Sequence, residues 1–431
     1  MGRSLELRIR KAIRTISDQL LGRSLREHYW AADQTRRRFA MLRQPENRVF
    51  ARVVRSDLSR FLFDSIEPLD GQTQERARAA VEWILRAQEA GGDGGVALGY
   101  FPCDVEKGWR PSYPETTGYI ISSLLEYTLR FQESAVGVKA LRMAEWEIET
   151  QMPSGAVQGG PVCPPEKQTP TAFNTGMVLD GWVSAYNFNH DIRFLEAARR
   201  AADWLVSDLD GEGYFRTNGQ FVAPGLIKTY NVLCAWAMHR LGDLVPNACY
   251  RSTAVRIVEA AIRKQQPNGW FADNCLTRPE APLLHTIGYT LQGVLEVGIA
   301  ARRDDFVEAS RRGVDGLLPQ ITSKGRIPGR FFQDWEPACF SSCLTGTAQL
   351  AIVCYRLYEH SGQRSYWNAA ERLLNYLKQV QVLDSGNPAL DGALPGSFPL
   401  FGGYMTAGYP NWATKYLLDA LLLQDRLLER A

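Results

Sequence analysis

The sequence predicts an all-α protein in which six helical hairpins close into a ring. The first observation behind this prediction is a repeat of threonine-containing segments, 54 to 59 residues apart, each at the start of an apolar helix. A period of this size is typical of one repeated supersecondary unit. Each unit buries its apolar face only against its neighbours, so we expect a single cooperative ring. The segments are Thr117-Gly118-Tyr119, Thr175-Gly176-Met177, Thr229-Tyr230-Asn231, Thr286-Ile287-Gly288 and Thr345-Gly346-Thr347, followed by a sixth at Pro410-Asn411-Trp412-Ala413-Thr414.

The second observation is that two kinds of helix alternate. Segments such as Val232 to Met238 and Ala348 to Cys354 are nearly apolar on all sides, which is typical of buried inner helices. The other kind is amphipathic and predicts an outer layer. Its members are Glu75 to Gln88, Val138 to Gln151, Arg193 to Ser207, Val255 to Gln266, Phe306 to Gln320 and Ser365 to Gln379. We expect the last inner helix, from about Thr414 to Leu428, to pack against the first outer helix and close the ring.

The ends of the outer helices carry a third signal. Gln88, Gln151 and Gln381 each follow an aromatic residue by five positions, and we expect these amides to cap the outgoing turn. Glycines follow within a few residues, and glycine is the usual residue where a helix ends in the left-handed conformation. They are Gly91, Gly155, Gly211, Gly269 and Gly325.

The N-terminal segment differs from the rest in charge. We assign residues 1–65 to a basic helical extension and residues 66–431 to the ring. The first 60 residues carry 15 Lys and Arg against 6 Asp and Glu, although the whole chain has a formal charge of only +2. A basic amphipathic helix can bind an anionic membrane surface or another protein. The alternative is a solvated helical face packed on the outside of the ring.

Several classes of protein are disfavoured. A formal charge of +2 gives no strong field for nucleic acid, and no nucleic-acid-binding motif is present. No signal peptide or apolar run of about eighteen residues is visible. The eight cysteines are scattered and are expected to be reduced, in a cytoplasmic protein. We expect no metal site and no cofactor, because zinc-ligand spacing, calcium loops and phosphate-binding glycine loops are all missing.

The connections between hairpins indicate where function lies. Because the helices alternate, every loop from an outer to an inner helix emerges at the same end of the ring, which we call the mouth. These loops combine aromatic, acidic and amide side chains, as at 99–104, 213–216, 269–273 and 330–336. Sugar rings stack on aromatic side chains and their hydroxyls need polar partners. The mouth therefore predicts a glycan-binding site; the alternative is that the aromatics fill gaps between hairpins.

At these segments the chain resembles the six-hairpin carbohydrate-active proteins, and most closely those associated with bacterial exopolysaccharide biosynthesis clusters. The resemblance covers about residues 75–425 and implies an (α/α)6 fold and an exopolysaccharide context. It implies no catalytic roles. The stretches that carry it are 111–120, Phe173-Asn174-Thr175-Gly176, 285–290, 342–346 and Tyr409-Pro410-Asn411-Trp412-Ala413.

Two sets of side chains could perform catalysis at the mouth. Glu115 could protonate a glycosidic oxygen, with Asp334 or Glu336 as the second carboxylate that glycosidases require. His285 and Tyr289, four residues apart on one helix face, could move protons in a uronate lyase or epimerase. The structural alternatives are a helix-dipole acid at Glu115, arginine-paired acids in the 334–336 loop and a capping histidine.

A further set of mouth residues is expected to bind substrate. Arg330 could neutralise a uronate carboxylate, and Asn174 could cap its helix as well as bind sugar. The full set is Tyr113, Trp109, Asp104, Asn174, Trp270, Arg330, Trp335, Tyr404, Tyr409 and Trp412.

Three functions follow from these residues. The first is an enzyme that cleaves or remodels a bacterial, acidic exopolysaccharide, as a glycoside hydrolase or a uronate lyase or epimerase. The second is a glycan-binding or scaffolding subunit without turnover. The third is a terpenoid-cyclase-like toroid, suggested by Gln265 to Phe271 and disfavoured because the Asp-x-Asp-Asp acid of those cyclases is missing.

Overall fold

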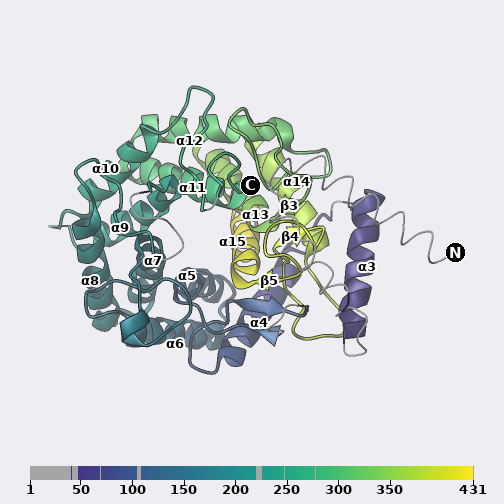
Figure 1. Cartoon of the computed structure of the whole chain (residues 1–431), viewed down its shortest axis with the longest axis horizontal. Coiled ribbons are helices and arrows are strands. Elements are labelled where there is room, and N and C mark those ends of the chain that lie inside the picture. Colours follow the sequence, from purple (N-terminus) through teal and green to yellow (C-terminus); the bar gives the residue numbers. More distant parts are fainter. Residues whose placement is uncertain are drawn as a thin grey trace.

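Twelve helices form a closed double ring (Figure 1), which confirms the predicted (α/α)6 toroid. The computed structural model describes residue 40 and residues 47–430, except 68, 104–107, 220–225, 247 and 277. The inner helices are α5 (Pro114–Phe131), α7 (Ala172–Asn189), α9 (Leu233–Leu244), α11 (Leu284–Ala301), α13 (Leu344–Ser361) and α15 (Asn411–Leu428). The outer helices are α4 (Thr73–Gly91), α6 (Ser134–Thr150), α8 (Ile192–Asp208), α10 (Tyr250–Ile262), α12 (Asp304–Leu317) and α14 (Arg364–Val380).

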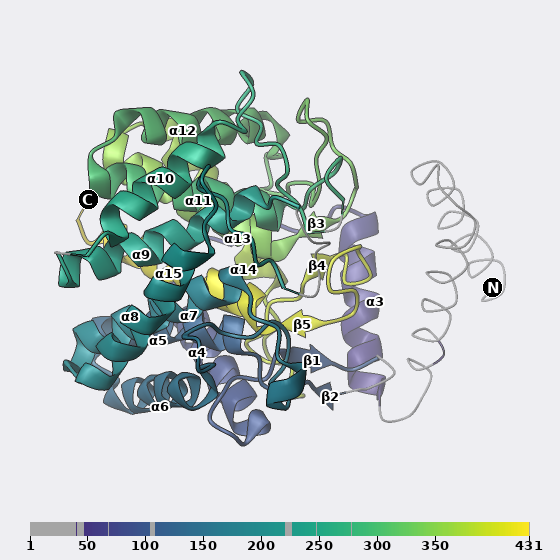
Figure 2. The ribbon, with the colours of Figure 1, turned by 60° about the vertical axis from the view of Figure 1, so that its left-hand side comes forward.

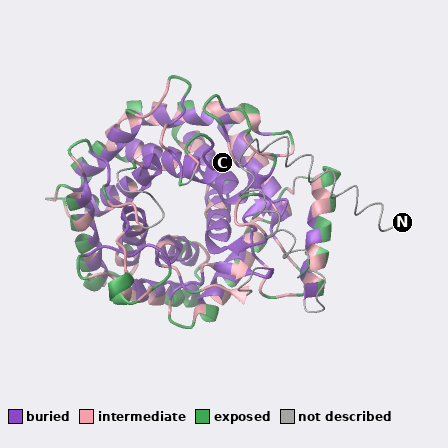
Figure 3. Ribbon diagram, in the orientation of Figure 1, coloured by how far each residue is buried: buried purple, intermediate pink, exposed green. Residues whose placement is uncertain are grey.

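Burial follows the helix types that the sequence distinguishes. The inner helices are buried almost throughout, whereas the outer helices expose one face (Figure 3). The described residues include the short 3-10 helices η2 (Pro165–Lys167), η3 (Thr229–Val232), directly before α9, and η4 (Leu318–Gln320), directly after α12. In the described part of the chain, each helix is either too short or too polar to cross a membrane.

The repeated threonines hold each inner helix to the loop that precedes it. In three units the threonine hydroxyl accepts a hydrogen bond of 2.9 Å from a backbone N–H of that loop. The pairs are Thr117 with Val96, Thr175 with Val157, and Thr414 with Leu394. The repeat that is visible in the sequence is therefore a repeated loop-to-helix contact.

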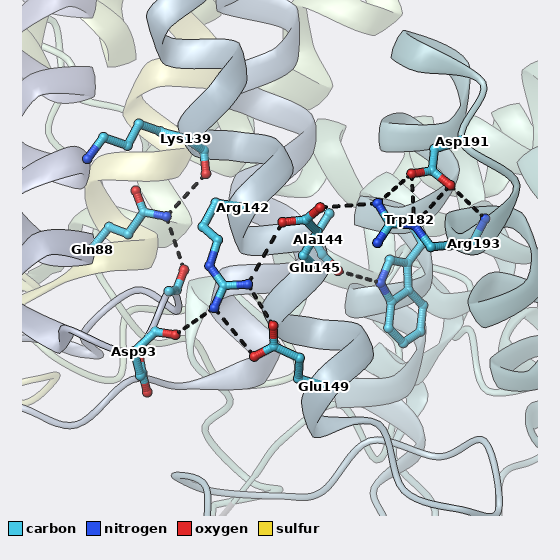
Figure 4. A network of polar contacts seen from close by, with 11 residues as sticks. Gln88, Asp93, Lys139, Arg142, Ala144, Glu145, Glu149, Trp182, Asp191 and Arg193 are labelled. Atoms are coloured by element: carbon cyan, nitrogen blue, oxygen red, sulfur yellow. Dashed lines mark hydrogen bonds and ion pairs between the residues drawn. The ribbon is translucent and has the colours of Figure 1, made fainter.

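The glutamines at the ends of the outer helices link neighbouring hairpins. Each donates from Nε2 to a glycine carbonyl in its own outgoing loop and to a carbonyl of the next outer helix, at 2.7 to 3.1 Å. Figure 4 shows the bond from Gln88 to the Lys139 carbonyl of α6. The four sets are Gln88 with Gly94 and Lys139, Gln151 with Gly155 and Ala197, Gln265 with Gly269 and Ala309, and Gln381 with Gly392 and Arg76.

The last of these bonds closes the ring, because it joins α14 to α4. The final inner helix, α15, packs against α4, as the sequence predicts, and also against α5 and α13. Lys378 of α14 is fully buried at this junction, where its Nζ lies 3.1 Å from Thr73 Oγ1 and 3.1 Å from Gln424 Oε1. The two ends of the repeat are thus held together by buried polar contacts as well as by apolar packing.

The five short strands found in the described part of the chain lie on one side of the ring (Figure 2). The strands β1 (Gly99–Phe101), β2 (Gly108–Trp109) and β5 (Tyr409–Pro410) form an antiparallel sheet in the order β2-β1-β5. The strands β3 (Ser342–Cys343) and β4 (Ser397–Phe398) pair separately. Because β3 and β5 run directly into α13 and α15, this side is where inner helices begin, and it corresponds to the predicted mouth.

Helix α3 (Arg48–Leu62) lies outside the ring beside these strands (Figure 1). The Phe50 ring packs edge-on against Tyr409, with centroids 6.3 Å apart. The buried carboxylate of Asp57 accepts a 2.6 Å hydrogen bond from the Leu400 backbone N–H. The remainder of the basic extension, residues 1–39 and 41–46, lies outside the described residues, so its proposed membrane or protein contact and the boundary at residue 65 stay predictions.

Close packing of α5 on α7 depends on Gly118, and we expect Gly118→Ala to destabilise the protein. A Cβ at Gly118 would lie 2.5 Å from Val178 Cα, and one at Gly181 would lie 2.3 Å from the Gly118 carbonyl oxygen. Overpacking of this kind costs about 1–3 kcal/mol, which exceeds the gain of about 1 kcal/mol in helix propensity. Thermal unfolding measures the effect. Gly211→Ala, with no atom within 4 Å of the added Cβ, is the control; equal melting temperatures for the two variants would refute the packing argument.

Candidate active site

Aromatic side chains from different inner helices meet at the axis of the ring. The Tyr416 ring of α15 lies 5.7 Å from Tyr119 of α5 and 6.0 Å from Tyr289 of α11, measured between centroids. Phe173 of α7 lies 4.8 Å from Tyr289. Four side chains stand one turn inside the starts of their helices and form what we call the floor of the site: Tyr119, Tyr289, Tyr416 and Gln349 of α13.

Glu115 lies in the first turn of α5, directly after Pro114. Its side chain is recessed: part of its surface remains accessible, yet enough protein surrounds it that desolvation raises the pKa of the carboxyl to about 7. A hydrogen bond from Tyr113 opposes this shift. Asn174, whose Nδ2 donates to the Gln158 carbonyl at 3.0 Å, also bonds Tyr113. At neutral pH Glu115 is therefore a mixture of protonated acid and carboxylate.

His285 lies in the first turn of α11 and is 6% exposed. Its Nδ1 lies 2.9 Å from Gln349 Oε1. Because that oxygen accepts, we assign the proton of the neutral ring to Nδ1, which leaves Nε2 as the basic nitrogen. Burial lowers the pKa of the imidazole to about 4, against a smaller opposing effect of the Gln349 bond. His285 is thus a neutral base at physiological pH.

Tyr289 and Tyr404 lie beside His285 and are affected by the charge of Glu115. Their rings lie 4.3 Å and 5.6 Å from the His285 ring, respectively. Burial raises the pKa of both phenols, and the charge of Glu115 adds to that shift in each. The two phenols that pack beside the base are therefore also within reach of the charge of the acid. Trp412 Nε1 donates a 2.8 Å hydrogen bond to the Tyr404 hydroxyl and fixes it at the mouth.

The structure thus gathers seven of the residues that the sequence singles out. They are Glu115, His285, Tyr289, Tyr113, Asn174, Tyr404 and Trp412. Arg330 lies at the edge of this group: its backbone bridges to Leu283, and its Nη1 donates to the Ala281 carbonyl at 2.6 Å.

Other candidates point elsewhere. Tyr409 is fully buried against Phe50 of α3, and the Trp109 ring packs 5.3 Å from Trp83 of the outer helix α4. Asp104 lies outside the described residues.

The loop of the fifth hairpin folds toward the outer layer. Trp270 and Trp335 are buried against each other, with centroids 5.1 Å apart, and Trp335 Nε1 donates to the Asn268 carbonyl at 3.0 Å. Asp334 and Glu336 flank this tryptophan and are exposed. A groove of about 470 Å³ beside Trp270 is lined neither by Glu115 nor by His285. We therefore leave Asp334, Glu336, Trp270 and Trp335 out of the proposed catalytic centre.

Sequence reasoning missed three floor residues, Tyr119, Tyr416 and Gln349. For the two tyrosines, the sequence does contain a spacing that could have identified them. Tyr119 and Tyr416 follow Glu115 and Trp412 by four positions, as Tyr289 follows His285, and this spacing places each tyrosine one turn deeper on the same helix face. In the described residues, no three His, Cys, Asp or Glu side chains gather in a way that could hold a metal ion.

Comparisons of sequence find no match to a family model or to a curated protein. Comparison of structure finds many matches. The unsaturated glucuronyl hydrolase of Bacillus sp. GL1 has a TM-score of 0.64 at 14% identity, covering 82% of this chain and 97% of that one. The shared fold is the (α/α)6 toroid. Cellobiose 2-epimerase of Bacillus thermoamylovorans has a TM-score of 0.63 at 9% identity, covering 83% and 99%.

An α-amylase of Clostridium perfringens gives a TM-score of 0.60 at 9% identity, covering 82% of this chain and 99% of that one. Three different activities on one fold show that the toroid does not decide the reaction. Function must therefore be argued from the side chains of the site.

Proposed function

We propose that this protein is a carbohydrate-active enzyme that transfers protons to and from a sugar with Glu115 and His285. The observation that carries the proposal is the presence of a carboxyl whose pKa is about 7 and a neutral imidazole whose pKa is about 4 around the same two tyrosines: the rings of Tyr289 and Tyr404 pack beside His285, and the charge of Glu115 acts on both phenols. A base and an acid held in one aromatic site are what proton transfer at carbon requires. The carbohydrate activities of the fold neighbours support the substrate class.

Epimerisation or elimination fits these residues better than hydrolysis by two carboxylates. Among the described carboxylates, Glu115 is the one whose charge acts on both Tyr289 and Tyr404, whereas glycosidases of the common type use a pair of carboxylates across the scissile bond. In our proposal His285 Nε2 takes a proton from a carbon next to a carbonyl, and protonated Glu115 returns one to the opposite face or to a leaving oxygen. Proton exchange with solvent then returns His285 to its neutral form and Glu115 to its protonated form.

Hydrolysis remains the second candidate, because the raised pKa of Glu115 suits a general acid and one fold neighbour is a glucuronyl hydrolase. We also propose that the substrate comes from an exopolysaccharide, on the basis of the sequence resemblance.

Turnover of oligosaccharides in D₂O separates these reactions. An epimerase incorporates solvent deuterium at carbon, a lyase forms a product with a new ultraviolet-absorbing double bond, and a hydrolase releases reducing ends with neither change. We expect deuterium at carbon. A protein that binds the oligosaccharides and shows none of the three outcomes would be a glycan-binding subunit, and the catalytic proposal would be abandoned.

The pH dependence of kcat/KM should be bell-shaped. Glu115 must be protonated, so activity is expected to fall as the pH rises through about 7. His285 must be neutral, so activity is expected to fall as the pH drops through about 4. Initial rates between pH 3.5 and 9, with folding checked by circular dichroism at each pH, measure both limbs. Activity that still increases above pH 8 would exclude Glu115 as the acid.

A further inference from the structure

We propose that the floor of the site binds the hydroxyls of an uncharged sugar, and that Tyr119, Tyr289 and Gln349 select this sugar against a uronate. This inference rests on the proposed function and names its substrate class. It differs from the acidic substrate that the sequence suggests.

Three buried polar atoms of the floor have no hydrogen-bond partner. They are the hydroxyl oxygens of Tyr119 and Tyr289 and Nε2 of Gln349, on side chains that are 2%, 3% and 0% exposed. The Tyr289 hydroxyl approaches those of Tyr119 and Tyr416, and Gln349 approaches the Tyr416 hydroxyl, but the three atoms named stay outside hydrogen-bond geometry. Buried donors without partners are unfavourable, so a ligand that pairs with them gains affinity. Two phenols and one amide N–H₂ match sugar hydroxyls, which both donate and accept.

These atoms lie beside the reactive pair. Gln349 binds His285 through its other amide atom, Oε1, and the Tyr289 ring lies 4.3 Å from the imidazole. The charge of Glu115 acts on Tyr119. A sugar held by the three groups would therefore present its carbon atoms to Glu115 and His285.

The charges around the floor do not favour a uronate. A bound carboxylate needs a cation or several donors aimed at it. Lys415 is buried under the floor, where its Nζ pairs with Asp419 Oδ2 at 2.6 Å and lies 4.0 Å from the Tyr416 ring centroid. The Arg330 guanidinium binds the Ala281 carbonyl. Both cations are thus engaged by other groups of the protein.

Binding measurements test this inference apart from catalysis. The Glu115→Gln variant would be titrated by calorimetry with glucose, galactose and mannose disaccharides and with their uronic acid counterparts, which differ at C6. We expect each binding pair to favour the neutral sugar by about tenfold or more. Tyr289→Phe and Gln349→Leu should each weaken neutral binding by about tenfold. Tyr127→Phe, which removes a buried hydroxyl bonded to Glu133 at a distance from the floor, is the control and should bind as the parent does.

The outcomes separate the two proposals. Tighter binding of uronates overturns the neutral-sugar inference. Equal affinities of Tyr289→Phe, Gln349→Leu and the parent for the neutral sugar, as expected when water alone occupies the floor, overturn it as well. Either result leaves the proposed proton-transfer catalysis standing. Failure of every disaccharide to bind also overturns it. Tight neutral binding with a wild-type protein that shows no turnover overturns the proposed catalysis and leaves the inference standing.

Discussion

Glu115→Gln is expected to lower kcat about 10²- to 10⁴-fold, the usual contribution of a positioned general acid. The amide is nearly isosteric and can still accept the Tyr113 hydrogen bond, but it cannot deliver a proton. KM should change little, because the sugar-binding groups on the floor remain. Steady-state kinetics with the best oligosaccharide substrate measures both constants.

The control for this variant is Glu196→Gln, the same change on the exposed face of the outer helix α8. It should retain wild-type kinetics.

Stability provides a second readout for Glu115→Gln. Because burial raises the pKa of Glu115 from 4.5 to about 7, its contribution to stability is complete below pH 4.5 and is lost as the pH rises through about 7. Glu115→Gln should therefore be at least as stable as wild type at pH 8. An active and well-folded Glu115→Gln variant would contradict the assigned role.

Glu147→Met is expected to stabilise the protein at pH 8. Glu147 of α6 is fully buried, and neither carboxyl oxygen has a hydrogen-bond partner. The nearby Thr150 hydroxyl donates instead to the backbone carbonyls of Trp146 and Glu147, at 3.1 and 3.3 Å. Burial, with a further contribution from the charge of Asp93, raises the pKa of this carboxyl well above its usual value. The expected gain is about 1–3 kcal/mol, the cost of a buried polar group without a partner.

The pH dependence distinguishes this effect from better packing. A carboxyl whose pKa is raised in the folded state stabilises most below pH 4.5 and loses that contribution as the pH rises through the folded-state pKa. The advantage of Glu147→Met should therefore be small at pH 5 and larger at pH 8. Urea denaturation at the two pH values measures it, with the exposed Glu196→Met as the control. An advantage that does not grow with pH would show that the carboxyl is ionised or paired in the fold.

Particular residues show which features of the fold and the site could be predicted from the sequence. The threonine repeat and the glutamines at 88, 151 and 381 predicted the hairpins, the capping bonds and the closure of the ring, because each acts within its own turn or on the next hairpin. Glu115 and His285 could be placed at the mouth because both begin inner helices. The floor was missed because Tyr119, Tyr416 and Gln349 lie in helices that read as ordinary buried segments.

The sequence by itself determined the number, type and order of the helices of the ring, since these depend on local periodicity and on polar residues at helix ends. Only the tertiary structure decided which aromatic side chains face the axis. Tyr404 turns inward to Trp412 and His285, whereas Tyr409, five residues later, turns outward to Phe50. It also decided the ionisation of Glu115 and His285, because desolvation depends on how many distant segments close around a group, and no local pattern encodes that number.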